Sequence, residues 1–173
     1  MGTSIILGQG YVGLPLAQAL VEIGDEVLGF DVNERLVSSL NSGRSHVDDI
    51  SSEALAEMIR GGYRATSDVE DIAKADTVVI CVPTPLDPHG GPDMTYVESA
   101  SQMAASNLKP GALVILESTT YPGTTTNLLL PLLQQQGREL DRDFYLAFSP
   151  ERIDPGNKHF NIRNTPKIVG GES

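Results

Sequence analysis

Three glycines near the start of the chain have a spacing that suggests chemistry. Gly8, Gly10 and Gly13 form the pattern G-x-G-x-x-G, after the apolar run at residues 4–7 and before a segment of helical periodicity. In such a strand, turn and helix, the first glycine permits a sharp turn, the second leaves room for a pyrophosphate and the third lets the helix lie close to the strand. The phosphates then meet free N–H groups at the positive end of the helix dipole. An ordinary glycine-rich turn has the same pattern, so the surrounding residues decide between the two interpretations.

An aspartate stands where a dinucleotide would need one. Residues 26–30 are predicted to form a second strand that ends at Asp31, about 20 residues past the first glycine of the pattern. A carboxylate at this place accepts hydrogen bonds from a ribose 2′-OH and repels a 2′-phosphate, so we expect NAD rather than NADP. The alternative is that Asp31 is the N-cap of the helix predicted to start near Glu34.

Polar residues follow three later apolar runs, at 77–82, 112–116 and 144–148. Unbroken runs of this kind are typical of parallel strands that are buried on both faces. Because ligands bind at the carboxyl ends of such strands, the polar clusters at 83–85, 117–120 and 149–152 are expected to line one site. Cys81 lies inside the first run and is expected to be a small buried apolar residue.

These strands need helices between them, and the periodicity predicts both kinds of element. Strands are expected at 4–7, 26–30, 64–67, 77–82, 112–116, 144–148 and 167–169. Helices are expected at 12–23, 34–40, 51–59, 94–108 and 121–136, with a helical turn at 68–73. Strands that alternate with helices predict an α/β fold of the Rossmann type, a doubly wound and mainly parallel sheet with helices on both faces. We expect residues 1–173 to form one dinucleotide-binding domain.

The composition narrows the classes of partner. The net charge of −11 disfavours nucleic acid and anionic membrane surfaces, so neither is an expected partner. The single cysteine cannot form an internal disulfide, and no apolar run approaches the roughly 18 residues of a membrane span. No metal site is expected, because His46 has no second His or Cys nearby. A cytoplasmic location is the default expectation.

Five ordered stretches make the chain resemble the UDP-glucose/GDP-mannose dehydrogenase family, whose members oxidise a nucleotide sugar at C6 to the uronic acid. The matching stretches are residues 8–15, 81–85, 117–125, 149–152 and 166–171. Residues 92–97 and 151–157 look most like the branch that acts on UDP-N-acetylhexosamines, UDP-GlcNAc or UDP-ManNAc. Pro155 stands where the UDP-glucose branch carries a second glutamate, which weakens an assignment to UDP-glucose. UDP-GlcNAc is the substrate that we favour.

The resemblance implies a role for each matching residue. The NAD pyrophosphate would be held by Gly8, Gly10, Tyr11, Val12 and Gly13, and the adenosine ribose by Asp31. The dinucleotide would then run along Val82, Pro83 and Thr84 towards a nicotinamide end bordered by Ser118 and Thr119. The resemblance also implies two catalytic residues. Thr119 would help to position a catalytic water, and Glu151 would act as the acid/base residue that activates this water to hydrolyse a covalent thioester. The alternative for Glu151 is a surface glutamate paired with Arg152.

The resemblance also implies parts that these residues do not contain. Family members continue through a long central helix, which forms a dimer, and a sugar-binding domain that supplies the nucleophilic cysteine. Cys81 is not that nucleophile, so we expect an isolated NAD-binding domain that does not turn over a UDP-sugar by itself, and a homodimer for the whole enzyme. Two other hypotheses stay open: the cofactor domain of a different dehydrogenase, such as a 3-hydroxyacid dehydrogenase, and a nucleotide-binding module without chemistry.

Overall fold

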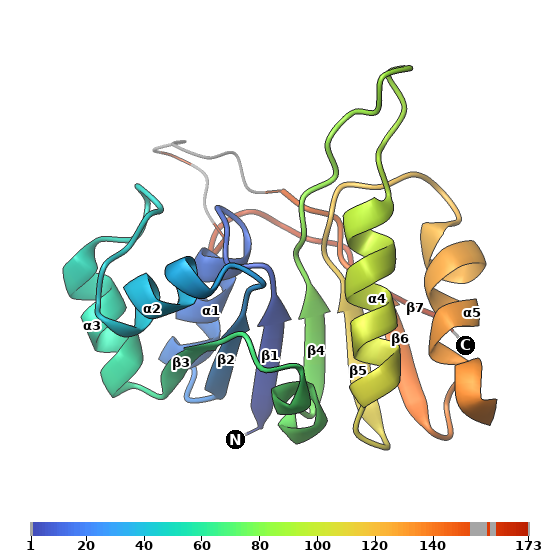
Figure 1. Cartoon of the computed structure of the whole chain (residues 1–173), viewed down its shortest axis with the longest axis horizontal. Coiled ribbons are helices and arrows are strands. Elements are labelled where there is room, and N and C mark those ends of the chain that lie inside the picture. The colour runs from blue at the N-terminus through green and yellow to red at the C-terminus, as the bar shows by residue number, and fades with distance from the viewer. Residues whose placement is uncertain (1, 153–158, 160–161, 173) are drawn as a thin grey trace.

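A single mainly parallel sheet forms the centre of the molecule. The computed structural model describes residues 2–152, 159 and 162–172. In this part of the chain, seven strands lie in the order β3-β2-β1-β4-β5-β6-β7, and β7 alone is antiparallel to its neighbour (Figure 1). The strands are β1 Thr3–Leu7, β2 Glu26–Phe30, β3 Tyr63–Thr66, β4 Thr77–Ile80, β5 Ala112–Leu116, β6 Phe144–Phe148 and β7 Gly170–Glu172. The predicted Rossmann-type α/β fold is confirmed.

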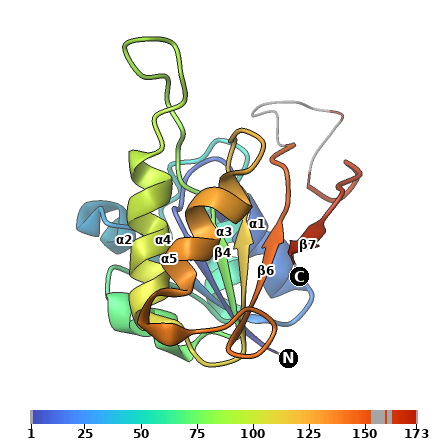
Figure 2. The same cartoon turned by 90° about the vertical axis from the view of Figure 1, so that its right-hand side faces the viewer.

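Helices cover both faces of this sheet. They are α1 Gly13–Glu22, α2 Glu34–Asn41, α3 Ser52–Arg60, α4 Thr95–Asn107 and α5 Leu130–Leu133. Helices α4 and α5 stand side by side on one face, as the two perpendicular views show (Figures 1 and 2). None of the helices in the described residues is long and apolar enough to cross a membrane.

The side chains of β1 alternate between the two faces of the sheet, which explains why the apolar core has two halves. Ile5 and Leu7 belong to the apolar cluster under α4 and α5, whereas Ile6 belongs to the cluster under α1, α2 and α3. Successive side chains of a strand point to opposite faces, so an unbroken apolar run is buried only when both faces are covered. Each fully buried Ile or Leu contributes about 1.5–3 kcal/mol to folding relative to an exposed one.

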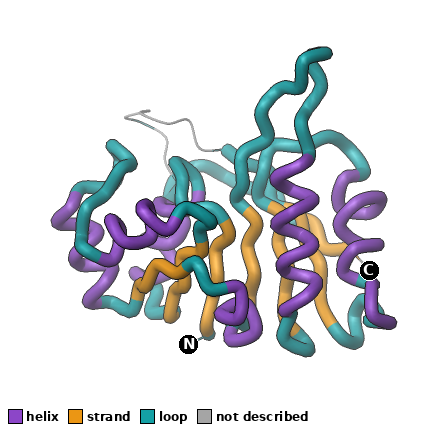
Figure 3. The backbone as a smooth tube through the Cα atoms, in the orientation of Figure 1, coloured by secondary structure: helices purple, strands orange, loops and turns teal. Residues whose placement is uncertain are grey.

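The chain order places a crevice beside β1. From β1 the chain moves outward to β2 and β3, then returns to place β4 on the other side of β1. The helices that follow β1 and β4 therefore leave the sheet on opposite faces, and a crevice opens between the carboxyl ends of these strands. Loops gather at this edge, and the one between β4 and α4 projects furthest (Figure 3).

Local capping explains several helix boundaries. The Asn33 side chain accepts hydrogen bonds from the N–H groups of Arg35 and Leu36 at the start of α2. Ser51 caps α3 in the same way through Ala54, and Gly24, with a φ of 94°, follows the end of α1. These caps bear out the helix starts and stops expected from the sequence.

One predicted helix is present but irregular, and one predicted strand is wrong. The helix expected over residues 121–136 is a π-helical turn at Thr125–Leu129, one α-helical turn at α5 and a 3₁₀ turn at Gln135–Gly137. Pro131 has no N–H to donate to the carbonyl of residue 127, so a regular helix cannot run through it. The last strand lies at Gly170–Glu172 rather than at 167–169, because pairing with β6 defines it. The branch motif at 151–157, with Pro155, lies mostly outside the described residues.

Candidate functional site

A cavity of about 290 Å³ lies at the carboxyl edge of the sheet, beside the glycine turn. It is formed by the turn itself, the end of β2, and the residues that follow β4, β5 and β6. Its lining residues are Gly8, Gln9, Gly10, Tyr11, Val12, Asp31, Leu36, Cys81, Val82, Pro83, Thr84, Glu117, Ser118, Thr119 and Glu151. The fold thus brings together every predicted site residue except Gly13.

The three glycines have different surroundings, and each fits the role predicted for it. Gly8 has a φ of +98°, and a Cβ on it would lie 2.6 Å from the carbonyl oxygen of Cys81. A Cβ on Gly13 would lie 1.9 Å from the Gly8 oxygen, so α1 packs directly on the turn. A Cβ on Gly10 would meet no atom within 4 Å. The backbone of Gly10 is therefore open to close approach by a ligand, as a pyrophosphate requires.

Helix α1 presents its N-terminus to this space. Its N-cap residue is Val12, and no side chain caps the first turn. An uncapped helix N-terminus with an adjacent glycine is suited to an anion, because both the N–H groups and the helix dipole favour negative charge. The acidity of the whole chain does not prevent anion binding here, since the donors are local.

Asp31 holds the glycine turn through one carboxylate oxygen and the start of the next loop through the other. Its Oδ2 accepts a hydrogen bond of 3.0 Å from the N–H of Gln9, and its Oδ1 accepts one of 2.9 Å from the N–H of Asn33. The alternative that Asp31 is the N-cap of the next helix is wrong, because Asn33 caps α2. The Asp31 carboxylate thus lies at the end of β2 and in the wall of the cavity.

A second cavity of about 250 Å³ adjoins the first and shares Gly8, Asp31, Val82 and Pro83 with it. Its remaining wall is mostly apolar, with Leu7, Phe30, Val32, Tyr96, Ser99, Ala100 and Met103. Asp31 therefore stands between an apolar slot and a polar cleft. This order of surfaces matches a ligand that has a flat apolar ring, then a sugar with hydroxyls, then phosphates.

Polar groups at the ends of β4 and β5 form the far wall of the cleft. The Ser118 hydroxyl donates to the carbonyl oxygens of Ile80 and Val82, at 3.2 and 3.0 Å, and so ties the two strand ends together. Thr119 is exposed beside it. The Thr84 hydroxyl oxygen is buried and has no hydrogen-bond partner among the described residues. Such an atom is costly in a folded protein, and it lies where a dinucleotide contact is predicted.

An ion pair that sequence reasoning missed lies behind this wall. Lys167 contacts the Glu117 carboxylate, and the two side chains are 17% and 6% exposed. Burial raises the pKa of Glu117, the neighbouring Lys167 opposes that rise, and the charge of Glu151 adds to it. Lys167 is the fiftieth residue after Glu117, so no local pattern in the sequence connects them.

Cys81 is enclosed, as its place in an apolar run indicates. It is buried at the end of β4, and burial raises the pKa of its thiol well above the usual value. A thiol of this kind is a poor nucleophile, because only the thiolate attacks a carbonyl efficiently.

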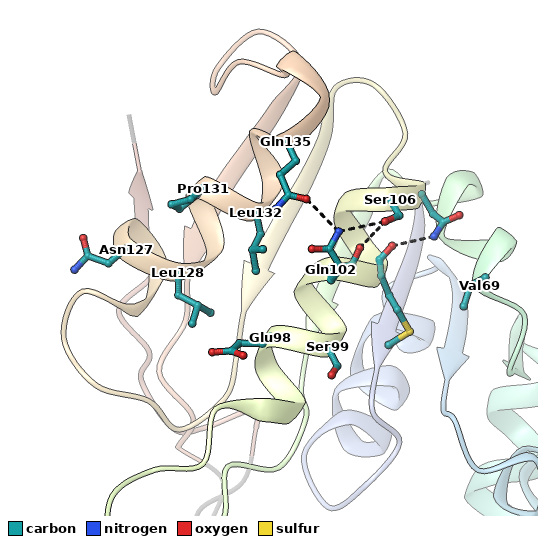
Figure 4. A pocket seen from close by; sticks show the side chains of 12 residues that line it. Val69, Glu98, Ser99, Gln102, Ser106, Asn127, Leu128, Pro131, Leu132 and Gln135 are labelled. Atoms are coloured by element: carbon teal, nitrogen blue, oxygen red, sulfur yellow. Dashed lines mark hydrogen bonds between the residues drawn. The ribbon is translucent and has the colours of Figure 1, made fainter.

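A wider groove of about 810 Å³ lies elsewhere, between α4 and the segment that contains α5 (Figure 4). A hydrogen bond of 3.2 Å from Gln102 to Gln135 joins its two sides. Its wall is a mixture of amides, hydroxyls and aliphatic side chains, with Glu98 as the titratable group. The groove includes no strand end and no glycine turn, so we place the candidate site at the carboxyl edge.

Comparison with protein families identifies the type of domain. The model of the NAD binding domain of the UDP-glucose/GDP-mannose dehydrogenase family matches residues 3–173. The chain belongs to this family. The cofactor of this domain family is NAD, as Asp31 predicted.

Relatives and solved structures in the family span most of this chain. The UDP-N-acetyl-D-glucosamine 6-dehydrogenase of Salmonella typhi is 39% identical over 173 residues, which are 97% of this chain and 39% of that protein. The UDP-D-ManNAc dehydrogenase structure from Pyrococcus horikoshii has a TM-score of 0.87 and 35% identity, and the match covers 98% of this chain and 41% of that one. The NDP-N-acetyl-D-galactosaminuronic acid dehydrogenase structure from Methanosarcina mazei has a TM-score of 0.89 and 31% identity, with 99% and 39% covered. The chain thus spans about two fifths of the length of these family members.

Proposed function

We propose that this domain holds the oxidant of an NAD-dependent nucleotide-sugar 6-dehydrogenase that converts a UDP-N-acetylhexosamine to its uronic acid. The observation that carries the proposal is the place of Asp31 between an apolar slot and the open backbone of Gly10. The surfaces follow the order of adenine, ribose and pyrophosphate in a dinucleotide.

Each part of NAD is assigned to a different group of the described residues. The apolar slot would take the adenine, the Asp31 carboxylate the adenosine ribose, and the turn from Gly8 to Gly13 the pyrophosphate. Val82, Pro83 and Thr84 would guide the chain of the dinucleotide towards Ser118 and Thr119. When bound, NAD supplies the acceptor for one hydride in each of two oxidations, alcohol to aldehyde and aldehyde to acid.

Two residues of the cleft suit the water that the second oxidation consumes. Glu151 lines the cavity near the buried Glu117, and a carboxylate there can take a proton from water. The exposed Thr119 hydroxyl can accept or donate one hydrogen bond to orient the same water. A cysteine that traps the aldehyde as a thioester precursor would come from outside these residues, because Cys81 is enclosed and protonated.

The remaining parts of the proposal concern the whole enzyme. We propose UDP-GlcNAc as the substrate, with UDP-ManNAc as the alternative, since relatives named for both are 36–39% identical to this chain. We also propose a central helix and a sugar-binding domain beyond these residues, a homodimer, a cytoplasmic location, and a role in supplying uronic acids for a polysaccharide. A second candidate function, a nucleotide-binding module without chemistry, uses the same cofactor site.

Calorimetric titration of this chain with NAD and NADP tests the cofactor site. Asp31→Ala should weaken NAD binding about 10- to 150-fold, because hydrogen bonds to a charged group are lost, and should reduce the preference for NAD over NADP. Asp48→Ala is the matched control, since Asp48 is exposed in a loop outside the cavity and removes the same charge. An unchanged NAD to NADP ratio in Asp31→Ala would contradict the ribose contact.

The activity is tested on a protein that includes the other domains of the family. With UDP-GlcNAc it should release about two NADH per sugar, one for each oxidation. Glu151→Gln should slow formation of the uronic acid and leave the first oxidation largely intact. NAD binding without oxidation of any UDP-sugar would favour the nucleotide-binding module instead.

A further inference from the structure

Gln9 differs from its neighbours in the glycine turn because its side chain points into the protein. It is 0% exposed, whereas Tyr11, two residues later, is 44% exposed. The Gln9 side-chain amide donates hydrogen bonds to the carbonyl oxygens of Ile6 and Gly8, at 2.9 and 3.1 Å. Its oxygen accepts a bond of 2.9 Å from the hydroxyl of Tyr63. Because carbonyl oxygens only accept, these partners define which end of the amide is nitrogen.

Tyr63 reaches Gln9 across an intervening strand. It is the first residue of the edge strand β3 and is 2% exposed, and β2 lies between β3 and β1. Gly29 of β2 leaves the space in which the two side chains meet. A Cβ at Gly29 would lie 2.4 Å from the Tyr63 hydroxyl oxygen and 2.5 Å from the Gln9 amide oxygen. The glycine in the middle of β2 is thus accounted for by this pair.

The protonation of Tyr63 favours a lasting hydrogen bond. Burial raises the pKa of Tyr63 far above its usual value, and the negative charge of Asp31 raises it further. The hydroxyl therefore keeps its proton at neutral pH and remains a donor to Gln9.

The same residue links the pair to the ligand-facing groups. The Gln9 main-chain N–H donates to Asp31 Oδ2 at 3.0 Å, and the preceding N–H of Gly8 donates to the carbonyl oxygen of Phe30 at 2.9 Å. A shift of Gln9 therefore moves both the glycine turn and the carboxylate at the end of β2. Tyr63 is not among the residues that line either cavity, and its hydrogen bond to Gln9 links it to the glycine turn.

We propose that Gln9 and Tyr63 are positioning residues for NAD. Their buried hydrogen bond holds the pyrophosphate turn and the Asp31 carboxylate in one fixed relation, so that both meet the cofactor without rearrangement. The inference rests on the proposed cofactor site. Preorganised groups bind more tightly because the cost of ordering them has already been met in folding.

The test measures NAD affinity and thermal stability separately. Tyr63→Phe keeps the ring and removes one hydrogen bond, so it should raise the Kd for NAD about fivefold. Gln9→Met keeps the length of the side chain but also removes the bonds to Ile6 and Gly8, so it should raise the Kd at least as much. Titrations are made far below the unfolding temperature of each variant, where nearly all molecules are folded. Tyr145→Phe is the matched control, because Tyr145 is exposed on β6, and its Kd should equal that of the unmodified chain. A lower unfolding temperature with an unchanged Kd in both variants would overturn the proposal.

A double variant and a substitution at Gly29 make the test independent of any one substitution. Gln9→Met already removes the bond between the two side chains, together with the two that Gln9 donates to Ile6 and Gly8. Adding Tyr63→Phe to it should therefore weaken NAD binding little beyond the stronger single variant. Gly29→Ala pushes a methyl group between the two side chains and should raise the Kd for NAD as well. Additive losses in the double variant, or an unchanged Kd in Gly29→Ala, would contradict the proposal.

The failure of this inference can be told from failure of the cofactor site. If Asp31→Ala weakens NAD binding while Tyr63→Phe and Gln9→Met do not, the site stands and the positioning role is wrong. If the unmodified chain does not bind NAD, both are wrong.

Discussion

Alanine substitutions at two glycines of the turn should have opposite effects on cofactor binding and on folding. Gly10→Ala and Gly13→Ala each add a single methyl group, three residues apart. The first should impair cofactor binding and spare folding, whereas the second should impair folding itself.

The surroundings of each glycine set the size of the effect on folding. A methyl group on Gly10 meets no protein atom within 4 Å. The free energy of unfolding should therefore stay unchanged or rise by about 0.4–1 kcal/mol, since alanine restricts the unfolded chain. A methyl group on Gly13 would lie 1.9 Å from the Gly8 oxygen and 3.2 Å from Ile6 Cγ2. Overpacking against backbone costs about 1–3 kcal/mol or more, from a total stability of about 5–15 kcal/mol.

The Kd for NAD should change most in Gly10→Ala, the variant in which folding is spared. In Gly10→Ala the methyl group occupies space that the pyrophosphate needs, and a clash of about 1–3 kcal/mol raises the Kd for NAD about 5- to 150-fold. Gly171→Ala is the matched control, because a methyl group on Gly171 of β7 would also meet no atom within 4 Å and would lie outside both cavities. Its Kd should not change.

Calorimetric titration with NAD and thermal unfolding, made on the same preparations, give both numbers. The reasoning is refuted if Gly10→Ala binds NAD as tightly as the unmodified chain, because the pyrophosphate then does not cross Gly10. It is equally refuted if Gly13→Ala unfolds at the unmodified temperature, because helix α1 then does not depend on its close approach to the turn.

Three further predictions concern buried ionisable groups. Burial acts to raise the pKa of Asp71, but bonds from Lys74, Thr66 and Arg64 outweigh it and lower the pKa to about 2. Asp71→Asn should therefore lose about 2 kcal/mol of stability at neutral pH. Urea unfolding should show that this loss shrinks as the pH falls from about 4 to about 2, where the unmodified carboxylate is half protonated. Lys167→Met leaves the buried Glu117 carboxylate without its cation and should lower the free energy of unfolding by about 3–5 kcal/mol at neutral pH. The loss should be smaller in acid, because the raised pKa of Glu117 lets its carboxylate protonate. Adding Glu117→Gln to Lys167→Met should restore most of the unfolding free energy. The Cys81 thiol should react with a disulfide reagent only after denaturation, and rapid reaction of the folded chain would contradict its enclosure.

Most of the cofactor half of the site could be predicted from local sequence. The roles of Gly8, Gly10 and Gly13 follow from their spacing, because a tight strand-to-helix turn has few conformations and each requires glycine at set positions. The place of Asp31 follows from the length of one helix and one strand. The meeting of the polar strand ends follows from parallel pairing, which brings all carboxyl ends to one edge.

Contacts between distant segments could not be predicted in this way. The bond between Gln9 and Tyr63 spans 54 positions, and it depends on the absence of a side chain at Gly29. The pair of Glu117 and Lys167 spans 50 positions and depends on how the last segment returns to the sheet. Helical periodicity also concealed the effect of Pro131, because one missing N–H matters to hydrogen bonding and leaves the apolar pattern unchanged.

The amino-acid sequence by itself determined the fold class, the glycine turn that we propose for the phosphates and the choice of NAD. Each depends on residues close together along the chain and on the periods of helix and strand. Only the tertiary structure decided how the turn is held. Whether Gln9 faces solvent or Tyr63, and whether Asp31 caps a helix or orients the turn, depend on the packing of β1, β2 and β3. The physical reason is that a hydrogen bond needs two groups within about 3 Å, and only the folded sheet brings these groups together.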